Sequence, residues 1–393
     1  MGQWNEAKIG EIAEVKGGKR IPKGRKLIKE PNSHPYIRIR NLGKTKYMQL
    51  NTDYEYVDEE TQQMIDRYIV NQGDILISVV GTIGLVGIVG NTLDKANQTE
   101  NCDKIINIKK VLSEYLYYYL VSSFGQDEIK KGTVGAVQPK LPLKNVKDIL
   151  VKYPPIIEQK QIVEFLSAID EKIELNETIN NNLLQQLHVL YLRLFCESAM
   201  DTPLRDVVAT TSGGTPSRKH DEYYSDSSIC WVKSKELLGN YIHETEEHIN
   251  DLAIKKSSAK LLPEHSVLIA MYGATVGAYG VISKPMTCNQ AVCALLCNEN
   301  YPYTYLFQIA YESQQKFINL AVGSAQQNIS QVLIKQLNLH SDLNIIQRFH
   351  DLALPMHQEI EFLQAENIRL SDLRDNLLPK LMSGELDVSD IDL

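Results

Sequence analysis

The cysteines and histidines are the side chains best able to bind a metal ion or to act as bases, and their spacing favours neither role. Six cysteines and nine histidines are dispersed along the 393 residues. Cys288, Cys293 and Cys297 lie closest together, but they form no CxxC pair and have no histidine near them in the sequence. Because zinc sites need such closely spaced ligands, we predict no metal site and expect reduced thiols.

Sequence motifs that mark catalytic sites are also missing. The chain has no P-loop, no HExxH or GxSxG motif, and no GxGxxG that follows a strand and opens a helix. Tyr153-Pro154-Pro155-Ile156 is similar to the Asn/Asp-Pro-Pro-aromatic motif of amino-methyltransferases, but it lacks the acid or amide that holds the target amine. We therefore predict a binding protein. An enzyme whose scattered carboxylates have no fixed spacing stays open as an alternative.

Positive charge is concentrated in one part of an acidic chain. The net charge is −8, but residues 1–150 carry +4, residues 151–203 carry −4, residues 204–340 carry −1 and residues 341–393 carry −7. Between Lys16 and Lys46 lie eleven basic residues and a single acid, Glu30. A dense basic segment on an acidic chain is typical of a surface that contacts nucleic-acid phosphates. An ordinary solvated surface is the alternative reading of this segment.

The sequence contains an internal duplication, so that its two halves are copies of one unit. The second half repeats apolar and glycine positions of the first at an offset of 192 or 193, and later positions at a smaller offset. The matching segments are Ile75-Leu76-Ile77 with Val267-Leu268-Ile269, Gly81 with Gly273, Gly84 and Gly87 with Gly277 and Gly280, Tyr115-Leu116 with Tyr305-Leu306, and Gly135–Gln138 with Gly323–Gln326. The uncharged stretch 75–93 is close to the length of a membrane span, but its regular glycines and β-branched residues indicate two buried strands.

A heptad pattern follows the first copy and predicts a long helix. Apolar residues and asparagines alternate in steps of four and three over 33 residues, roughly 50 Å of helix. This seam comprises Ile162, Leu166, Ile169, Ile173, Asn176, Asn180, Leu183, Leu187, Leu190 and Leu194. A shorter seam near the C-terminus comprises Ile360, Leu363, Asn367, Leu370, Arg374, Leu377 and Leu381. We expect the two helices to pack antiparallel, with their asparagines hydrogen-bonded across the seam. A solvated position for each asparagine is the alternative.

These patterns predict an α+β fold with two duplicated globular domains and two long helices, packed as an antiparallel coiled coil about a pseudo-two-fold axis. The expected segments are a globular domain at 1–153, a helix at 154–201, a second globular domain at 202–341, a second helix at 342–385 and an acidic tail at 386–393. Pro355 is expected to break or kink the second helix and Pro379 to end it. The N-terminus has no apolar core, so no signal peptide is predicted.

This organisation resembles the specificity (S) subunit of type I restriction-modification systems, and three motifs carry the resemblance over essentially the whole chain. They are Pro154-Pro155-Ile156-Ile157-Glu158-Gln159 followed by Ile162-Val163 and Ile169–Ile173, then Leu377–Leu386 (LLPKLMSGEL), and Gly73–Ser78 (GDILIS) with Gly81-Thr82-Ile83-Gly84. The second half departs from the pattern. Asn344-Ile345-Ile346-Gln347 keeps the glutamine but lacks the double proline and the glutamate.

The resemblance implies a DNA-recognition subunit without catalytic activity or a cofactor of its own. Each globular domain, a target recognition domain, would read one half of a split sequence in double-stranded DNA, and the helices would set the spacing. Two methyltransferase (modification) subunits would dock on the helices and bring S-adenosylmethionine, and restriction subunits would use ATP and Mg. We expect the chain in the cytoplasm, without a membrane partner. A coiled-coil scaffold without sequence-specific DNA binding and a self-sufficient DNA-modifying enzyme are the alternatives.

The candidate DNA-binding residues come from loops and strand ends, where arginine and lysine serve guanine or phosphate and amides serve adenine. In the first domain they are Lys19, Arg20, Lys23, Arg25, Lys26, Arg38, Arg40, Asn41 and Lys140. In the second domain they are Thr215, Ser217, Arg218, Lys219, Lys233, Lys235, Tyr272, Gln326, Gln327 and Asn328. For any single one of these residues, a structural or solvated role is an equal alternative.

Overall fold

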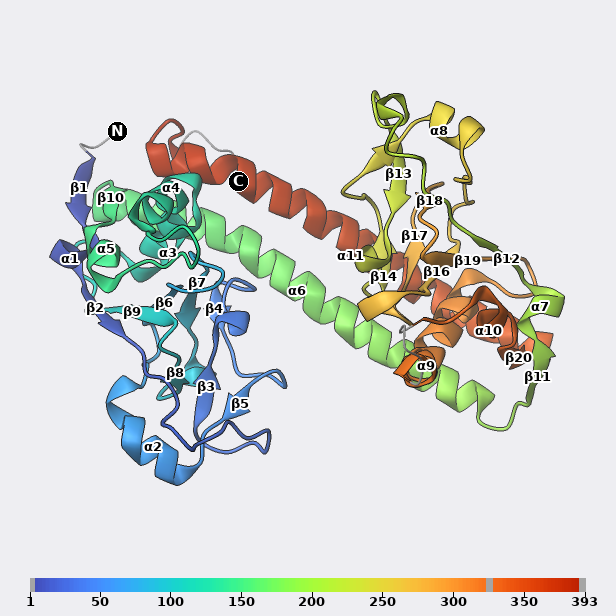
Figure 1. Ribbon diagram of the computed structural model, residues 1–393, viewed down its shortest axis with the longest axis horizontal. Coiled ribbons are helices and arrows are strands. Elements are labelled where there is room, and N and C mark those ends of the chain that lie inside the picture. Colours follow the sequence, from blue (N-terminus) through green and yellow to red (C-terminus); the bar gives the residue numbers. More distant parts are fainter. Residues whose placement is uncertain (1–3, 323–327, 389–393) are drawn as a thin grey trace. The chain divides into compact units, whose positions relative to one another are not determined.

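The chain folds into two compact units that share two long helices. The computed structural model describes residues 4–322 and 328–388 (Figure 1). Unit 1 is Met1–Ile173 with Leu370–Leu393, and unit 2 is Glu174–Arg369. The helices α6 (Ile156–Phe195) and α11 (Leu343–Ser383) each contribute one part to each unit. Each unit thus combines one globular domain with a segment of both helices.

The globular domain of unit 1 is built from three small sheets. A five-stranded sheet has the order β2 (Glu14–Gly17), β9 (Cys102–Ile106), β6 (Ile75–Ser78), β7 (Val86–Val89) and β4 (Tyr47–Met48). A three-stranded sheet has the order β5 (Glu55–Tyr56), β3 (Pro35–Ile37) and β8 (Asn97–Gln98), and β1 (Asn5–Lys8) pairs with β10 (Leu150–Tyr153). The short helices are α1 (Ile9–Ile12), α2 (Glu59–Ile65), α3 (Ser113–Val121), α4 (Ser123–Gly132) and α5 (Leu143–Asp148).

Unit 2 repeats this topology strand for strand. Its sheets have the orders β12 (Ala209–Ser212), β19 (Val292–Leu296), β16 (Val267–Ala270), β17 (Tyr279–Ile282), β14 (Asn240–Ile242), then β15 (His248–Ile249), β13 (Ile229–Val232), β18 (Thr287–Cys288), and β11 (Met200–Pro203) with β20 (Asn338–His340). Its other helices are the short α7 (Leu204–Val207), α8 (Asp251–Lys256) and α10 (Gln331–Lys335), and the longer α9 (Tyr303–Val322). The predicted duplication is confirmed at the level of sheet topology.

The uncharged stretch forms two buried strands, as its composition predicted. On β6, Ile75 and Ile77 face a core shared with α3, α6 and α11, while Leu76 faces a second core under the three-stranded sheet. Burial on both faces explains why the strand reads as a continuous apolar run. Gly81 and Gly84, in the turn that joins β6 to β7, have φ of +76° and +89°, which favours glycine. Among the described residues, no helix is both long and apolar enough to cross a membrane.

In unit 1 the two long helices pack against each other and against the globular domain. Ile162 and Leu166 of α6 share one core with Leu378 and Leu381 of α11. Towards the middle of α6, Asp170 forms an ion pair with Arg374 of α11 at 2.9 Å. Residue numbers rise along one helix as they fall along the other, so the pair is antiparallel, as predicted.

In unit 2 the predicted asparagine contact is present. Asn176 is fully buried and donates through Nδ2 to Asn367 Oδ1 and to Glu366, each at 2.7 Å. Asn180 is also buried, but its Oδ1 has no hydrogen-bond partner among the described residues. The hypothesis of hydrogen bonding across the seam is therefore confirmed for Asn176 and not for Asn180.

The C-terminal half of the α6 seam follows a different phase from the one predicted. Leu187 is buried, but beyond it Tyr191 and Phe195 enter the core more deeply than Leu190 and Leu194. A straight helix turns every 3.6 residues and drifts from a strict heptad repeat, so four-residue steps take over where the helix packs on a globular domain. The remaining predicted seam residues, Leu183 and Ile173 on α6, Ile360, Leu363, Leu370 and Leu377 on α11, lie in or against the cores of their units.

The predicted break of α11 at Pro355 and its predicted end at Pro379 are both wrong. The helix continues through Pro355 and Pro379 to Ser383. Pro355 is exposed while its neighbours Ala353 and His357 are buried, so the core contacts of the helix hold both sides of the proline together. The end comes at Gly384, whose φ of +73° is typical of a residue that terminates a helix.

Candidate nucleic-acid interface

A short turn after the central strand of the three-stranded sheet presents the first two basic residues. Strand β3 ends at Ile37, and a 3₁₀ turn, η1 (Ile39–Asn41), follows. The side chain of Asn41 accepts a 2.8 Å hydrogen bond from the Arg38 N–H and is only 7% exposed. Asn41 therefore shapes the turn from inside, while Arg38 and Arg40 are exposed on it.

One carboxylate on the neighbouring strand holds both arginines. Glu55 on β5 accepts from Arg38 Nη1 at 2.5 Å and from Arg40 Nη2 at 3.0 Å. Arg40 also donates to the Asp53 carbonyl at 2.9 Å, and Lys44 pairs with the Asp53 carboxylate at 3.2 Å. The basic residues of this turn are thus fixed in orientation before any ligand arrives.

The basic loop that precedes β3 lies against the same turn. The Tyr36 hydroxyl donates to the Lys19 carbonyl at 2.8 Å, and a Cβ at Gly18 would lie 2.1 Å from the Thr99 carbonyl oxygen. Only glycine allows this close approach of two backbones. A surface hollow is lined by charged and polar residues of this loop and turn, among them Arg20, Arg25, Lys26, Arg38, Glu55, Glu100 and Asn101. Two adjoining hollows are lined by Arg40, one together with Arg38 and Thr82 and the other together with Lys29 and Lys44.

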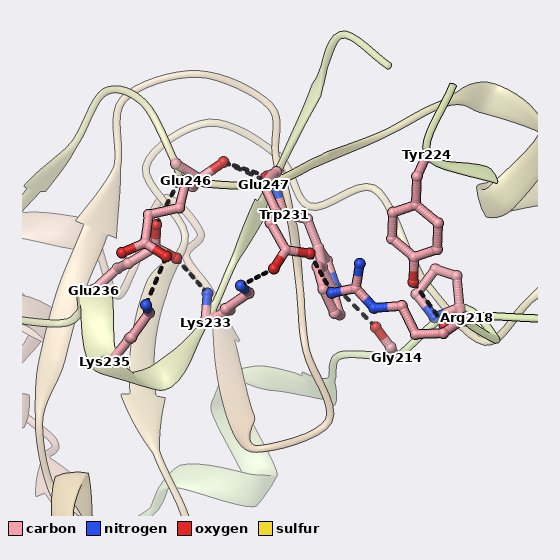
Figure 2. Close-up of polar contacts among 11 residues, drawn as sticks. Gly214, Arg218, Tyr224, Trp231, Lys233, Lys235, Glu236, Glu246 and Glu247 are labelled. Atoms are coloured by element: carbon pink, nitrogen blue, oxygen red, sulfur yellow. Dashed lines mark hydrogen bonds and ion pairs between the residues drawn. The ribbon is translucent and has the colours of Figure 1, made fainter. Parts of the chain in front are cut away.

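Unit 2 builds the same kind of site with other side chains (Figure 2). The 3₁₀ turn η5 (Ser234–Glu236) follows β13. Within it, Glu236 Oε2 accepts a 2.7 Å hydrogen bond from the backbone N–H of Lys233. Glu247 pairs with both Lys233 and Arg218, and Lys235 pairs with Glu246 at 2.6 Å. The hydrogen bond from Lys233, together with that from Arg218, holds the pKa of the Glu247 carboxyl below its usual range, so this carboxylate is charged at neutral pH.

Aromatic side chains support the cations of unit 2. The guanidinium of Arg218 lies 4.3 Å from the ring centre of Tyr224 and 5.4 Å from that of Trp231. Trp231 donates through its indole N–H to the Gly214 carbonyl at 3.0 Å (Figure 2). Stacking on aromatic faces keeps a guanidinium planar and oriented, and leaves its remaining N–H groups available at the edge.

The strand registers show that the two sites are structurally equivalent. Tyr36 lies opposite Glu55 in the β3–β5 pair, and the Trp231 N–H likewise donates to the Glu247 carbonyl beside β15. Each of these aromatic side chains also donates a hydrogen bond to a backbone carbonyl in the preceding loop. Tyr36 donates to Lys19, and Trp231 donates to Gly214. Because Tyr36 and Trp231 are equivalent, the residues two and four positions after them are equivalent as well. Arg38 therefore corresponds to Lys233 and Arg40 to Lys235. Glu55 and Glu247, which pair with Arg38 and Lys233, also correspond.

A family model described as the type I restriction modification DNA specificity domain matches residues 1–185 and 198–340. The chain belongs to the family of type I DNA specificity subunits. The predicted family is therefore confirmed.

Individual relatives agree over nearly the full length. The MjaIX specificity subunit of Methanocaldococcus jannaschii is 26% identical over 99% of this chain and 94% of its own. The HindI specificity subunit of Haemophilus influenzae is 21% identical over 98% of this chain and 100% of its own. The crystal structure of an S subunit from M. genitalium covers 97% of this chain and 96% of its own, with a TM-score of 0.58 and 14% identity. That last similarity supports the predicted fold alone.

The other predicted DNA-binding residues of this specificity subunit lie on other segments of the two units or outside the described residues. The Lys19 ammonium lies 5.6 Å from the centre of the Tyr68 ring, and the backbone of Lys140 forms isolated β-bridges with Val80 and Val134. Tyr272 bridges Asn328 in the equivalent place of unit 2. The exposed residues Lys23, Thr215, Ser217 and Lys219 belong to the two loops that follow Gly18 and Gly213. Gln326 and Gln327 lie outside the described residues.

Two features of the site have no counterpart in the sequence prediction. The first is the pair of glutamates, Glu55 and Glu247, which join strands that are separated in the sequence. The second is a group of three potential metal ligands, Cys230, Glu244 and His248, whose ligand atoms lie within 4.8 Å of one another. Lys284 is bonded to Glu244 and brings a positive charge to this group, which opposes a cation there.

Proposed function

We propose that each globular domain of this specificity subunit reads one half of a bipartite DNA sequence through its turn of paired basic residues. The observation that carries this proposal is the equivalence of Arg38 with Lys233 and of Arg40 with Lys235. Both arginines pair with Glu55 on β5, and the two lysines pair with Glu247 and Glu246 just before β15. Arginine forks suit guanine edges, and both residue types suit phosphates. The reading domains span residues 1–153 and 202–341 in this proposal.

The helices at 154–201 and 342–385 act as the spacer between the two half-sites and as the docking site for two modification subunits. Membership of the specificity family supports this role, because the family name places such chains in restriction-modification enzymes. In this proposal the chain is not catalytic and binds no cofactor. The modification subunits bind S-adenosylmethionine, restriction subunits bring ATP and Mg, and the complex acts in the cytoplasm. The acidic tail at 386–393 is not assigned a role.

The experiment that tests the proposal is a map of DNA methylation by long-read sequencing. A host carries the modification subunit either with or without this chain. We expect methylation on a two-part motif only when the chain is present. Equal methylation patterns in both hosts, with a modification subunit shown to be active, would contradict sequence reading and leave the scaffold alternative.

Substitution of the paired cations tests the reading domains one at a time. Arg38→Ala should weaken binding of the complex to its target and reduce the slope of log affinity against log salt by about one, because one phosphate or base contact is lost. Lys233→Ala should do the same through the other domain. The matched control is Lys8→Ala. It removes an exposed lysine of β1, whose ammonium pairs with the Asp148 carboxylate at 2.8 Å. Salt titrations of equilibrium binding measure the effect, and slopes equal to that of the control would reject the assignment.

A further inference from the structure

We propose that Glu55 and Glu247 are specificity-determining positioning residues that hold the DNA-reading cations in one orientation. The inference rests on the proposed function and deepens it, because it names how the same sites discriminate between sequences. The residues bind no base in this proposal. They act through Arg38 and Arg40 in unit 1 and through Lys233 and Arg218 in unit 2.

The geometry gives the glutamates this role because each carboxylate binds two cations from different segments. A single oxygen of Glu55 accepts from both Arg38 and Arg40, and the two oxygens of Glu247 divide between Arg218 and Lys233. Two neighbouring cations repel each other and have long, flexible side chains. A shared carboxylate removes that repulsion and reduces the number of rotamers each cation adopts before DNA binds.

The energetics argue against a purely stabilising role. The side chains of Arg38 and Arg40 are 44% and 53% exposed in their pairs with Glu55, and solvent-exposed ion pairs add little to stability. A carboxylate among DNA-binding cations also repels phosphates, so it lowers non-specific affinity. Glu55 thus contributes little to stability through these pairs and opposes non-specific binding, yet an acid stands at the equivalent position of unit 2, where Lys233 is 20% exposed. Orientation of the paired cations explains an acid at both positions.

The neighbouring acids are arranged differently, and this sets Glu55 and Glu247 apart. Lys235 has its own acid, Glu246, and Glu236 caps the η5 turn through the backbone N–H groups of Lys233 and Glu246. Figure 2 shows that Glu247 lies between Lys233 and the Arg218 guanidinium, beside the Trp231 ring. Only a group in this central position can fix two reading side chains relative to each other.

The test uses the complex of the full chain with its modification subunits and duplexes that carry the mapped target or a target with one scrambled half-site. Glu55→Gln should lower the preference for the correct half-site read by its own domain on the order of tenfold, the size of one good base contact. Preference at the other half-site should not change. Affinity for a random duplex should rise, and the salt slope should steepen by about one. Glu247→Gln should relax the opposite half-site.

Two further variants separate position from charge. Glu55→Asp keeps the charge but withdraws the carboxylate by one methylene, so it should relax the half-site without steepening the salt slope. Glu6→Gln is the control, because it removes one negative charge and one exposed pair, with Lys152 at 3.8 Å, on β1 of the same unit. It should leave the half-site preference unchanged.

Three outcomes would overturn the inference. One is a Glu55→Gln complex that behaves like the Glu6→Gln control. Another is an equal loss of preference at both half-sites, which would indicate a general structural defect. The third is a switch to a different base with undiminished preference, which would mean that the glutamate reads the base directly. If Arg38→Ala itself leaves target binding unchanged, the proposed function fails, whereas a normal Arg38→Ala effect with an unaltered Glu55→Gln complex rejects the inference alone.

Discussion

At the scale of single residues, the two units fasten their globular domains to the long helices with different chemistry. In unit 1 the Tyr118 hydroxyl donates to Asp170 at 2.6 Å, and the buried Lys46 donates to Ser167 at 2.7 Å. In unit 2 the Tyr241 hydroxyl bonds to the ring of His357 at 2.8 Å, and the Thr304 hydroxyl bonds to the ring of His350 at 2.9 Å. One of the two duplicated joints therefore depends on neutral histidines.

Burial of these histidines makes unit 2 sensitive to acid. Desolvation, with repulsion from His350 and His265, lowers the pKa of His357 to about 3, and burial also lowers the pKa of His340 and His350. Since the unfolded chain takes up a proton near pH 6.5, the contribution of His357 is complete above that pH. It is lost as the pH falls from 6.5 towards 3. His265 acts in the opposite direction, because its interaction with the Glu361 carboxylate, 3.5 Å away, raises its pKa.

We expect acidification from pH 7 to pH 5 to lower the free energy of unfolding of unit 2 by about 2 kcal/mol through His357 alone. His357→Gln should flatten this pH dependence, because glutamine does not titrate. Urea unfolding at pH 7 and pH 5 measures both effects. The control is His220→Gln, which changes an exposed histidine of the same unit. An undiminished pH dependence in His357→Gln would show that other groups carry it.

At the scale of elements, the two buried asparagines of the α6 seam differ in the bonds that they make across it. Asn176 Nδ2 donates to two acceptors of α11, whereas the Oδ1 of Asn180, like that of Asn176, has no partner in the described part of the chain. Loss of Asn176 leaves its two acceptors without this donor, and a buried polar group without its bond costs about 1–3 kcal/mol, whereas removal of an unpartnered buried oxygen removes such a cost. We therefore expect the two positions to respond to the same substitution with opposite sign.

Asn176→Leu should destabilise unit 2 by about 1–3 kcal/mol, because Asn367 loses its buried donor. Asn180→Leu should be neutral or stabilising by up to about 1 kcal/mol. The double change Asn176→Leu with Asn367→Leu should recover most of the first loss, as is expected of a directly bonded pair. Urea unfolding of the three variants gives these values. Equal effects at positions 176 and 180 would contradict a register role for Asn176.

Much of the element structure could be predicted from the sequence, because it depends on local patterns. The heptad steps predicted both long helices. The glycines and β-branched residues predicted β6, β7 and their copies in unit 2. The continuous α11 was not predicted, since the intrinsic effect of Pro355 is local whereas the buried contacts that override it come from distant residues. The shift to Tyr191 and Phe195 was missed for the same reason.

The site was only partly predictable. Basic residues on loops could be found by counting charges, so Arg38, Arg40, Arg218 and Lys233 were named. Their pairing with Glu55 and Glu247 depends on strands of two residues, which leave no periodic signal. Asn41 is a base-contacting candidate by residue type, because an amide can bond adenine, but its side chain caps the turn from within.

At the scale of the whole molecule, the proposed spacer can be tested by lengthening both helices. One heptad inserted after Ile173 in α6 and one after Arg369 in α11 add about 10 Å to each helix and preserve the seam. Because DNA rises about 3.4 Å per base pair, the gap between the half-sites in the methylated motif should grow by about three base pairs. Insertion into α6 alone should abolish methylation by mismatching the seam. A motif with unchanged spacing after both insertions would show that the helices do not set the distance.

The balanced charges of the two turns have a consequence for how such a complex searches a genome. In the proposed function the glutamates neutralise part of each basic surface, so we expect one domain alone to bind DNA weakly and to leave a lone half-site quickly. When both half-sites are present at the right distance, the first contact raises the effective concentration of the second domain at its own half-site. We expect long residence only on complete targets, so that chromosomal half-sites do not sequester the complex.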